Sequence, residues 1–239
     1  MDIIIGTGLL ILVLAIFSLF NYKAPRGAKA MGALASAACA SFLVEAFQDS
    51  FFGKVLGFQF LSEVGGANGS LSGVAAAILV AIAIGVSPGY AVLIGLSVSG
   101  TGIIPGFIAG YLVSFLIKWM EKNIPGGLDL IAIIIVGAPL TRFLAQLITP
   151  VINSTLLTIG DILTSSANSN PIIMGMILGG TIVVVATAPL SSMALTAMLG
   201  LTGIPMAIGA LSVFGSSFMN GVLFHRLKLG ERKDNIAFA

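Results

Sequence analysis

The run IIIGTGLLILVLAIFSLF, residues 3–20, is the strongest single signal in this sequence. Its 18 apolar residues are enough for a helix that crosses the roughly 30 Å hydrocarbon core of a bilayer. The remaining chain has the same character: 57% of its 239 residues are hydrophobic and 8% are charged, against about 25% charged residues in soluble domains. The sequence therefore predicts an all-α polytopic membrane protein. It excludes nucleic-acid binding, secreted disulfide scaffolds and soluble dinucleotide-binding enzymes.

Basic residues gather in three clusters, within 23–29, 118–122 and 226–233. The positive-inside rule places such clusters on the cytoplasmic side of the membrane. The first apolar run has no basic residue before it, whereas a cleaved signal peptide carries its positive charge first. We therefore expect residues 1–22 to form a retained lead transmembrane helix with its N-terminus outside, and residues 226–239 to form a basic cytoplasmic tail.

The apolar segments between these clusters follow one order twice, at an offset of 101 residues. Ser87-Pro88 corresponds to Ala188-Pro189, and Thr101-Gly102 corresponds to Thr202-Gly203. We expect a first membrane repeat over 23–122 and a second over 123–225; whether they are parallel or inverted stays open. The expected segments are 30–47, 71–86, 89–100 and 103–120, then 128–148, 172–187, 190–201 and 204–224, with polar stretches at 48–70 and 149–170.

In each repeat the third segment is too short to cross a bilayer and begins beside a proline, Pro88 or Pro189. A proline inside a helix removes a backbone donor, and the carbonyls that it frees cannot face lipid. Paired broken helices of this kind point to a transporter's substrate site. We therefore expect Ser87, Pro88, Pro189, Ser191 and Ser192 to line such a site; ordinary proline kinks are the alternative.

Charged and amide side chains within apolar segments are the other candidates for substrate binding. Glu45 could accept sugar hydroxyls or lie in the outer interface. Arg142, with Gln146 one helical turn later, could bind an anionic substrate, pair with Glu45 or extend toward the interface. Asn220 could bind substrate or join helices by hydrogen bonds. Two further polar residues, Asp161 and His225, are expected to be solvated and interfacial, respectively.

Two stretches carry a family resemblance: TGIIPGFIAGYLVSFLIKW at 101–119, and NPIIMGMILGG followed by TAPLSSMALTAM within 170–198. With APRGAKAMGALASAACASFLVEAF at 24–47, the chain resembles membrane IIC subunits of the bacterial phosphoenolpyruvate-dependent sugar phosphotransferase system (PTS), fructose-like branch. It is similar to a IIC-like group that includes the perfringolysin regulator, PfoR. The resemblance implies a permease subunit in the bacterial plasma membrane. Such a subunit translocates a sugar and receives phosphoryl groups from a cytoplasmic IIB partner.

Alternatives to a permease remain open at this stage. The sugar-binding G-I-T-E signature of glucose-type IIC proteins is absent, which favours a membrane-embedded regulator or sensor that does not transport. A secondary transporter of a small anion that uses Arg142 is a further alternative. Any enzymatic activity is at most that of a sugar phosphotransferase acting with IIB. Cys39 is the only cysteine, and no metal or cofactor is expected. The spacing Gly106–Gly110 favours close helix packing, including a homodimer in the bilayer.

Overall fold

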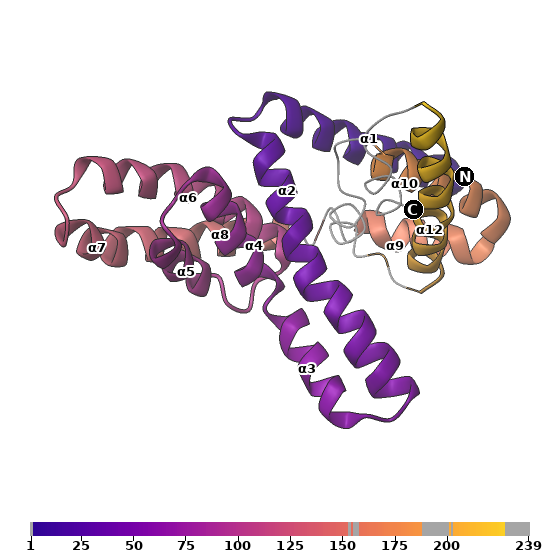
Figure 1. Ribbon diagram of the computed structural model, residues 1–239, viewed down its shortest axis with the longest axis horizontal. Coiled ribbons are helices and arrows are strands. Elements are labelled where there is room, and N and C mark those ends of the chain that lie inside the picture. Colours follow the sequence, from indigo (N-terminus) through magenta and orange to yellow (C-terminus); the bar gives the residue numbers. More distant parts are fainter. Residues whose placement is uncertain (1, 153, 155–157, 188–200, 202, 228–239) are drawn as a thin grey trace.

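The computed structural model describes residues 2–152, 154, 158–187, 201 and 203–227, and these contain helices and no strand. Helix α1 (Asp2–Lys23) is followed by a tight turn and α2 (Gly27–Ala38), as Figure 1 shows. Arg26 adopts a left-handed conformation in this turn, with φ of 57°. Gly27 is required next, because a Cβ there would overlap the Phe20 carbonyl oxygen and lie 2.9 Å from that of Asn21.

Helix α2 continues through two π-helical segments, η1 (Cys39–Leu43) and η2 (Ala46–Val55), and the chain then reverses into α3 (Gln59–Ser70). Gly57 makes the reversal with φ of 81°. The stretch 48–70, predicted as a polar connection, is thus largely a helical hairpin. Its polar residues contact one another across the two helices, and glycines let the helices approach: a Cβ on Gly53 would lie 2.6 Å from the Ser62 Cβ.

Helix α4 (Ser72–Ile84) follows α3 after a 53° bend, and a short helix, α5 (Pro88–Ser97), turns back along it before α6 (Ile103–Asn123). The end of α5 lies beside the start of α4, since a Cβ on Gly95 would lie 3.3 Å from the Val74 carbonyl oxygen. Helix α6 runs parallel to α4: Gly106 meets Gly73, and Gly110 meets Ala77. Helices α5 and α6 therefore form a hairpin whose tip lies near the α3–α4 bend.

Gly106 and Gly110, predicted as a possible dimer face, pack inside the chain. A Cβ on Gly106 would lie 2.8 Å from the Cα of Gly73, and one on Gly110 would lie 2.7 Å from the Cα of Ala77. Both glycines are buried. The close approach that this spacing permits is therefore used between α4 and α6, and the dimer remains a prediction without this support.

A rod of three consecutive segments then returns along α6: α7 (Leu128–Ala132), η3 (Ile133–Gly137) and α8 (Ala138–Ile152). Gly137 accommodates the buried Ile117 side chain, whose Cδ1 would lie 2.5 Å from an added Cβ. Further along, Ala145 joins a small buried cluster with Ala77, Val98 and Ala109. The rod is thereby fixed against the α4–α6 unit along much of its length.

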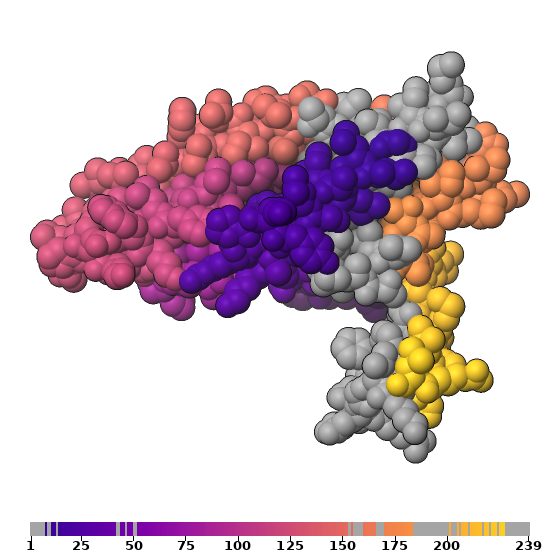
Figure 2. Space-filling model, turned by 90° about the horizontal axis from the view of Figure 1, so that it is seen from above, coloured from indigo at the N-terminus to yellow at the C-terminus, as the bar shows by residue number. Residues whose placement is uncertain are grey.

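The second half of the described chain contains α9 (Thr158–Ser169), α10 (Pro171–Thr187) and α12 (Gly203–Arg226). Helix α12 packs on α10, where Gly179 leaves room for Ser212. Figure 2 shows α12 projecting from the body of the molecule, with exposed apolar side chains such as Phe214 and Phe218. The predicted segment 190–201 lies, except for Leu201, outside the described residues. Helices α10 and α12 fall where the offset of 101 maps α4 and α6, but the repeat itself remains a prediction.

Within the described residues, two helices are long and apolar enough to cross a membrane: α6 and the continuous rod Leu128–Ile152. The bent pair α3–α4 counts as a third if it forms one broken span. Many large apolar side chains of the rod are exposed, including Ile135 at 66% and Leu147 at 60%, as lipid contact requires. The all-α membrane fold is confirmed.

Candidate functional site

One break within the described membrane segments lies at the α3–α4 bend, between Gln59–Ser70 and Ser72–Ile84. Its cause is local: the Asn68 side chain donates to the Val64 carbonyl (2.9 Å) and the Ser70 hydroxyl donates to the Ala67 carbonyl (2.8 Å). Side-chain hydrogen bonds of this kind compete with the helical ladder, and Gly-Ser pairs are frequent kink sites. Gly69 and Ser70 therefore bend the span without a proline.

Glu45 lies on one side of this bend, at the junction of η1 and η2. Its carboxylate rests on the backbone of Gly69, where an added Cβ would overlap both the carboxyl carbon and one oxygen. The side chain is half-buried and has no hydrogen bond within the described part of the chain. Gln48, three residues later, has a buried Oε1 that likewise finds no partner among the described residues. Both side chains offer free acceptors for ligand hydroxyl groups.

The tip of the α5–α6 hairpin lies on the other side of the bend. The carbonyls of Thr101 and Gly102 face Gly73, the second residue of α4, where a Cβ would lie 2.8 Å from the Gly102 oxygen. Within the tip, the Thr101 hydroxyl donates to the Val98 carbonyl at 2.7 Å. Gly73 is four residues, about one helical turn, beyond Gly69. Glu45 therefore contacts the chain just before the bend, and the hairpin tip contacts it just after the bend.

Arg142 reaches the same tip from α8. Its Nη1 donates to the Ser99 carbonyl at 2.6 Å and makes a long contact of 3.4 Å with that of Ser97. These carbonyls stand at the C-terminal end of α5, the negative end of its dipole, where a cation is stabilised. The Nε and Nη2 donors of Arg142 have no partner in the described structure. Gln146 is exposed one turn later on α8.

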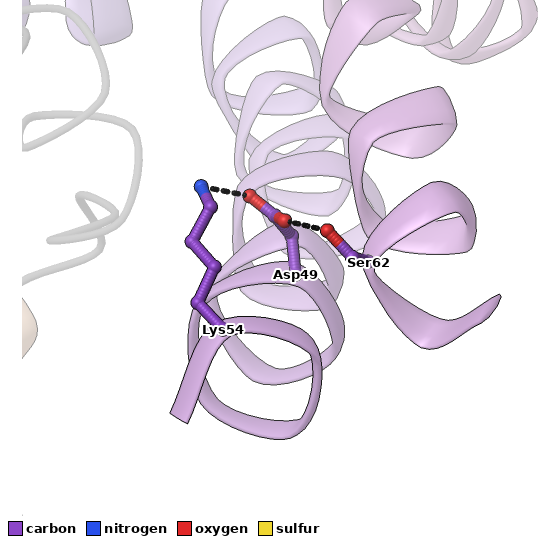
Figure 3. A network of polar contacts seen from close by, with 3 residues as sticks. All are labelled: Asp49, Lys54 and Ser62. Carbon is purple, nitrogen blue, oxygen red and sulfur yellow. Dashed lines mark hydrogen bonds and ion pairs between the residues drawn. The ribbon is translucent and has the colours of Figure 1, made fainter. Parts of the chain in front are cut away.

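The predicted pair between Glu45 and Arg142 is not formed. The ion pair of the described residues joins Lys54 and Asp49, with Nζ and Oδ2 2.6 Å apart. The Ser62 hydroxyl donates to the other oxygen of Asp49 (Figure 3). The hydrogen bond from Lys54, followed by that from Ser62, lowers the pKa of Asp49 from its ordinary value. Glu45 therefore remains unpaired, and Arg142 uses backbone carbonyls instead.

Ser87 and Pro88 lie at the opposite end of α5 from Arg142. Pro88 is the first residue of α5, where the missing N–H costs nothing, so the expected interruption before the short segment lies between Ile84 and Pro88, and the alternative of a kink inside a continuous helix does not apply. The Ser87 amide donates to the Glu121 carboxylate at 3.0 Å. Ten residues of helix, about 15 Å, separate this end from the tip, so Pro88 lies away from the α3–α4 bend, which forms at Gly69 and Ser70.

The remaining predicted site residues lie in the second half of the chain. Pro189, Ser191 and Ser192 are outside the described residues. Asn220 lies within α12, but its side chain is not among those described. Asp161 and His225 are exposed. No cluster of three His, Cys, Asp or Glu side chains that could hold a metal ion occurs in the described residues.

Comparison with known proteins gives one assignment. The model of a family described as phosphotransferase system, EIIC, matches residues 28–239. The chain belongs to this family. No curated protein and no solved structure matches the chain. The family makes it a membrane-embedded PTS IIC component, whose substrate is a sugar and whose partner is a IIB component. The finer resemblance to the fructose-like branch and to PfoR remains a prediction.

Proposed function

We propose that this IIC chain is a sugar permease subunit that binds its substrate at the α3–α4 bend, between Glu45 and the tip of the α5–α6 hairpin. The observation that carries the proposal is the set of free polar groups at this break. Glu45 and Gln48 offer acceptors, while Arg142 offers donors beyond the one that holds Ser99. A sugar hydroxyl both donates and accepts hydrogen bonds, so it matches both kinds of group.

The basic clusters support an orientation for the chain in the membrane. Arg26 and Lys118, from two of these clusters, contact the same carbonyl at the end of α4. The base of the hairpin would then face the cytoplasm, and the tip would lie part-way across the bilayer. A sugar at the tip would be reached from outside and released toward a IIB partner at the base. The second repeat, including Pro189, Ser191, Ser192 and Asn220, would supply the facing half of the site.

A thermal-unfolding screen of the purified full-length chain in detergent tests this function. The ligands are neutral sugars, sugar acids and sugar phosphates, because a ligand that binds the folded state raises its unfolding temperature. We expect a saturable rise with one sugar. Arg142→Gln should weaken its apparent affinity by about ten-fold or more, because a hydrogen bond to a charged group contributes about 1.5–3 kcal/mol. Glu45→Gln should also weaken binding.

The matched control is Lys122→Gln, which removes an exposed charge at the far end of α6 and should leave the affinity unchanged. A flat response from folded protein across the whole panel would refute the permease function and favour the regulator. Uptake into proteoliposomes distinguishes a PTS permease from a secondary transporter of a small anion. Uptake that follows an ion gradient and ignores a phosphorylated IIB component would identify a secondary transporter.

A further inference from the structure

The end of α4 carries a concentration of positive charge that the sugar site does not use. Arg26, from the turn between α1 and α2, and Lys118, from α6, both donate to the carbonyl oxygen of Ile84, the latter at 3.3 Å. A Cβ on Gly85 would lie 3.2 Å from the Lys118 nitrogen and 3.3 Å from an Arg26 nitrogen. Two cations distant in sequence therefore meet over one stretch of backbone.

Arg26 is held firmly in this position. The Tyr111 hydroxyl donates to the carbonyl of the preceding residue, Pro25, at 2.8 Å. The Tyr111 ring also packs edge-on against Phe20, with centroids 5.1 Å apart. Arg26 itself adopts the left-handed conformation, which is costly for a residue with a Cβ. The fold thus maintains a strained residue that presents its guanidinium to the end of α4.

Capping of α4 does not account for both cations. The C-terminus of a helix carries about half a negative charge, whereas Arg26 and Lys118 bring two positive charges. Neither forms an ion pair within the described part of the chain. The carboxylate of Glu121 accepts a hydrogen bond from the Ser87 amide, and its single negative charge, added to that of the helix end, is still less than the two positive charges. Positive charge therefore remains in excess, with unused donors on both side chains. Gly85 and Arg26 are exposed, so the cluster is open to a ligand.

We propose that Arg26 and Lys118 form a binding site for a phosphate-type oxyanion at the base of the α5–α6 hairpin. A guanidinium binds phosphate oxygens through paired N–H donors, and an ammonium adds a point charge. The occupant is a phosphoryl group, carried either by a soluble phosphate compound or by a phospholipid headgroup. The site stands on these two side chains and does not depend on sugar binding at the tip.

The test uses the purified full-length chain in a neutral detergent and measures thermal unfolding against inorganic phosphate, with sodium chloride at matched ionic strength. We expect a saturable stabilisation by phosphate. Arg26→Gln/Lys118→Gln should weaken the apparent affinity by about ten-fold or more. The control Lys29→Gln/Lys122→Gln removes the same charge from exposed neighbours and should bind phosphate as the wild type does.

Two further arms complete the test. Mixed micelles with phosphatidylglycerol, compared with phosphatidylcholine, identify the lipid source: stabilisation by phosphatidylglycerol alone that needs Arg26 and Lys118 assigns the site to a headgroup. If the double variant does not fold, Arg26→Lys and Lys118→Arg keep the charges and should retain binding. Equal losses in the Arg26/Lys118 and Lys29/Lys122 variants, or no stabilisation by either phosphate source, would overturn the proposal. If the wild-type protein binds phosphate but no sugar of the panel, that result refutes only the permease function.

Discussion

Replacement of Gly106 by alanine tests the packing on which the hairpin and its tip depend. The added Cβ would overlap the Gly73 carbonyl oxygen and lie 2.8 Å from the Gly73 Cα. Both are backbone atoms, so no side chain can rotate away and the two helices must separate. Overpacking of this kind costs about 1–3 kcal/mol, whereas alanine gains about 0.8–1 kcal/mol over glycine in helix propensity. The net effect is a loss of up to about 2 kcal/mol.

The matched control is Gly32→Ala in α2, where no atom lies within 4 Å of the new Cβ. It keeps the propensity gain without the clash, so the two variants should differ by about 1–3 kcal/mol. At about 2–4 °C per kcal/mol for a chain of this size, the unfolding midpoints should lie roughly 2–12 °C apart. Equal midpoints would refute the α4–α6 contact. If Gly106→Ala instead changed the oligomeric state measured by cross-linking and left the unfolding midpoint of the monomer unchanged, the result would support the dimer face predicted from the sequence.

Two other contacts outside the proposed sugar site give measurable predictions. The folded-state pKa of Asp49 lies below its ordinary value of 3.8, so the stability from its contact with Lys54 is complete above that pH and declines as the pH falls through the lowered pKa. Thermal unfolding between pH 6 and about 3 should show this decline, and a profile unchanged in Asp49→Asn would contradict it. Tyr90 donates to Asp129 at 2.7 Å and ties the base of α5 to α7. Tyr90→Phe and Asp129→Asn should each lower the unfolding temperature, and together less than additively; additive losses would mean that the two do not act as a pair.

The sequence predicted the apolar helices well because their signal is local and strong. The span expected at 103–120 is α6 (Ile103–Asn123), and that expected at 128–148 is the rod Leu128–Ile152. The short segment expected at 89–100 is α5. Length, apolar composition and the flanking prolines determine these elements with little help from tertiary contacts. The same pattern could not show that the polar stretch 48–70 is helical, because contacts between η2 and α3 stabilise it.

Two features of the candidate site could not be predicted from the sequence, for physical reasons. The bend at Gly69 and Ser70 lies in a polar stretch without a proline, and it forms through side-chain hydrogen bonds to the backbone, which the sequence alone does not reveal. Partner choice is also a tertiary property. Arg142 was recognised as unusual within an apolar segment, but the carbonyl of Ser99, its acceptor, is 43 residues away. Nothing in the pattern of residues identifies a backbone acceptor at that distance.

Backbone carbonyls at helix ends explain the positions of several basic residues. In a bilayer every freed carbonyl must find a donor within the protein, so an interrupted helix requires a polar side chain nearby wherever the interruption occurs. The interruption at the end of α4 is met by Arg26 and Lys118, and the one at the end of α5 is met by Arg142. Each of these cations lies beside a helix end, and each keeps donors that no described group accepts. The polar contacts at the ends of α4 and α5 therefore follow from where these helices end, and Pro88 marks where the next helix begins.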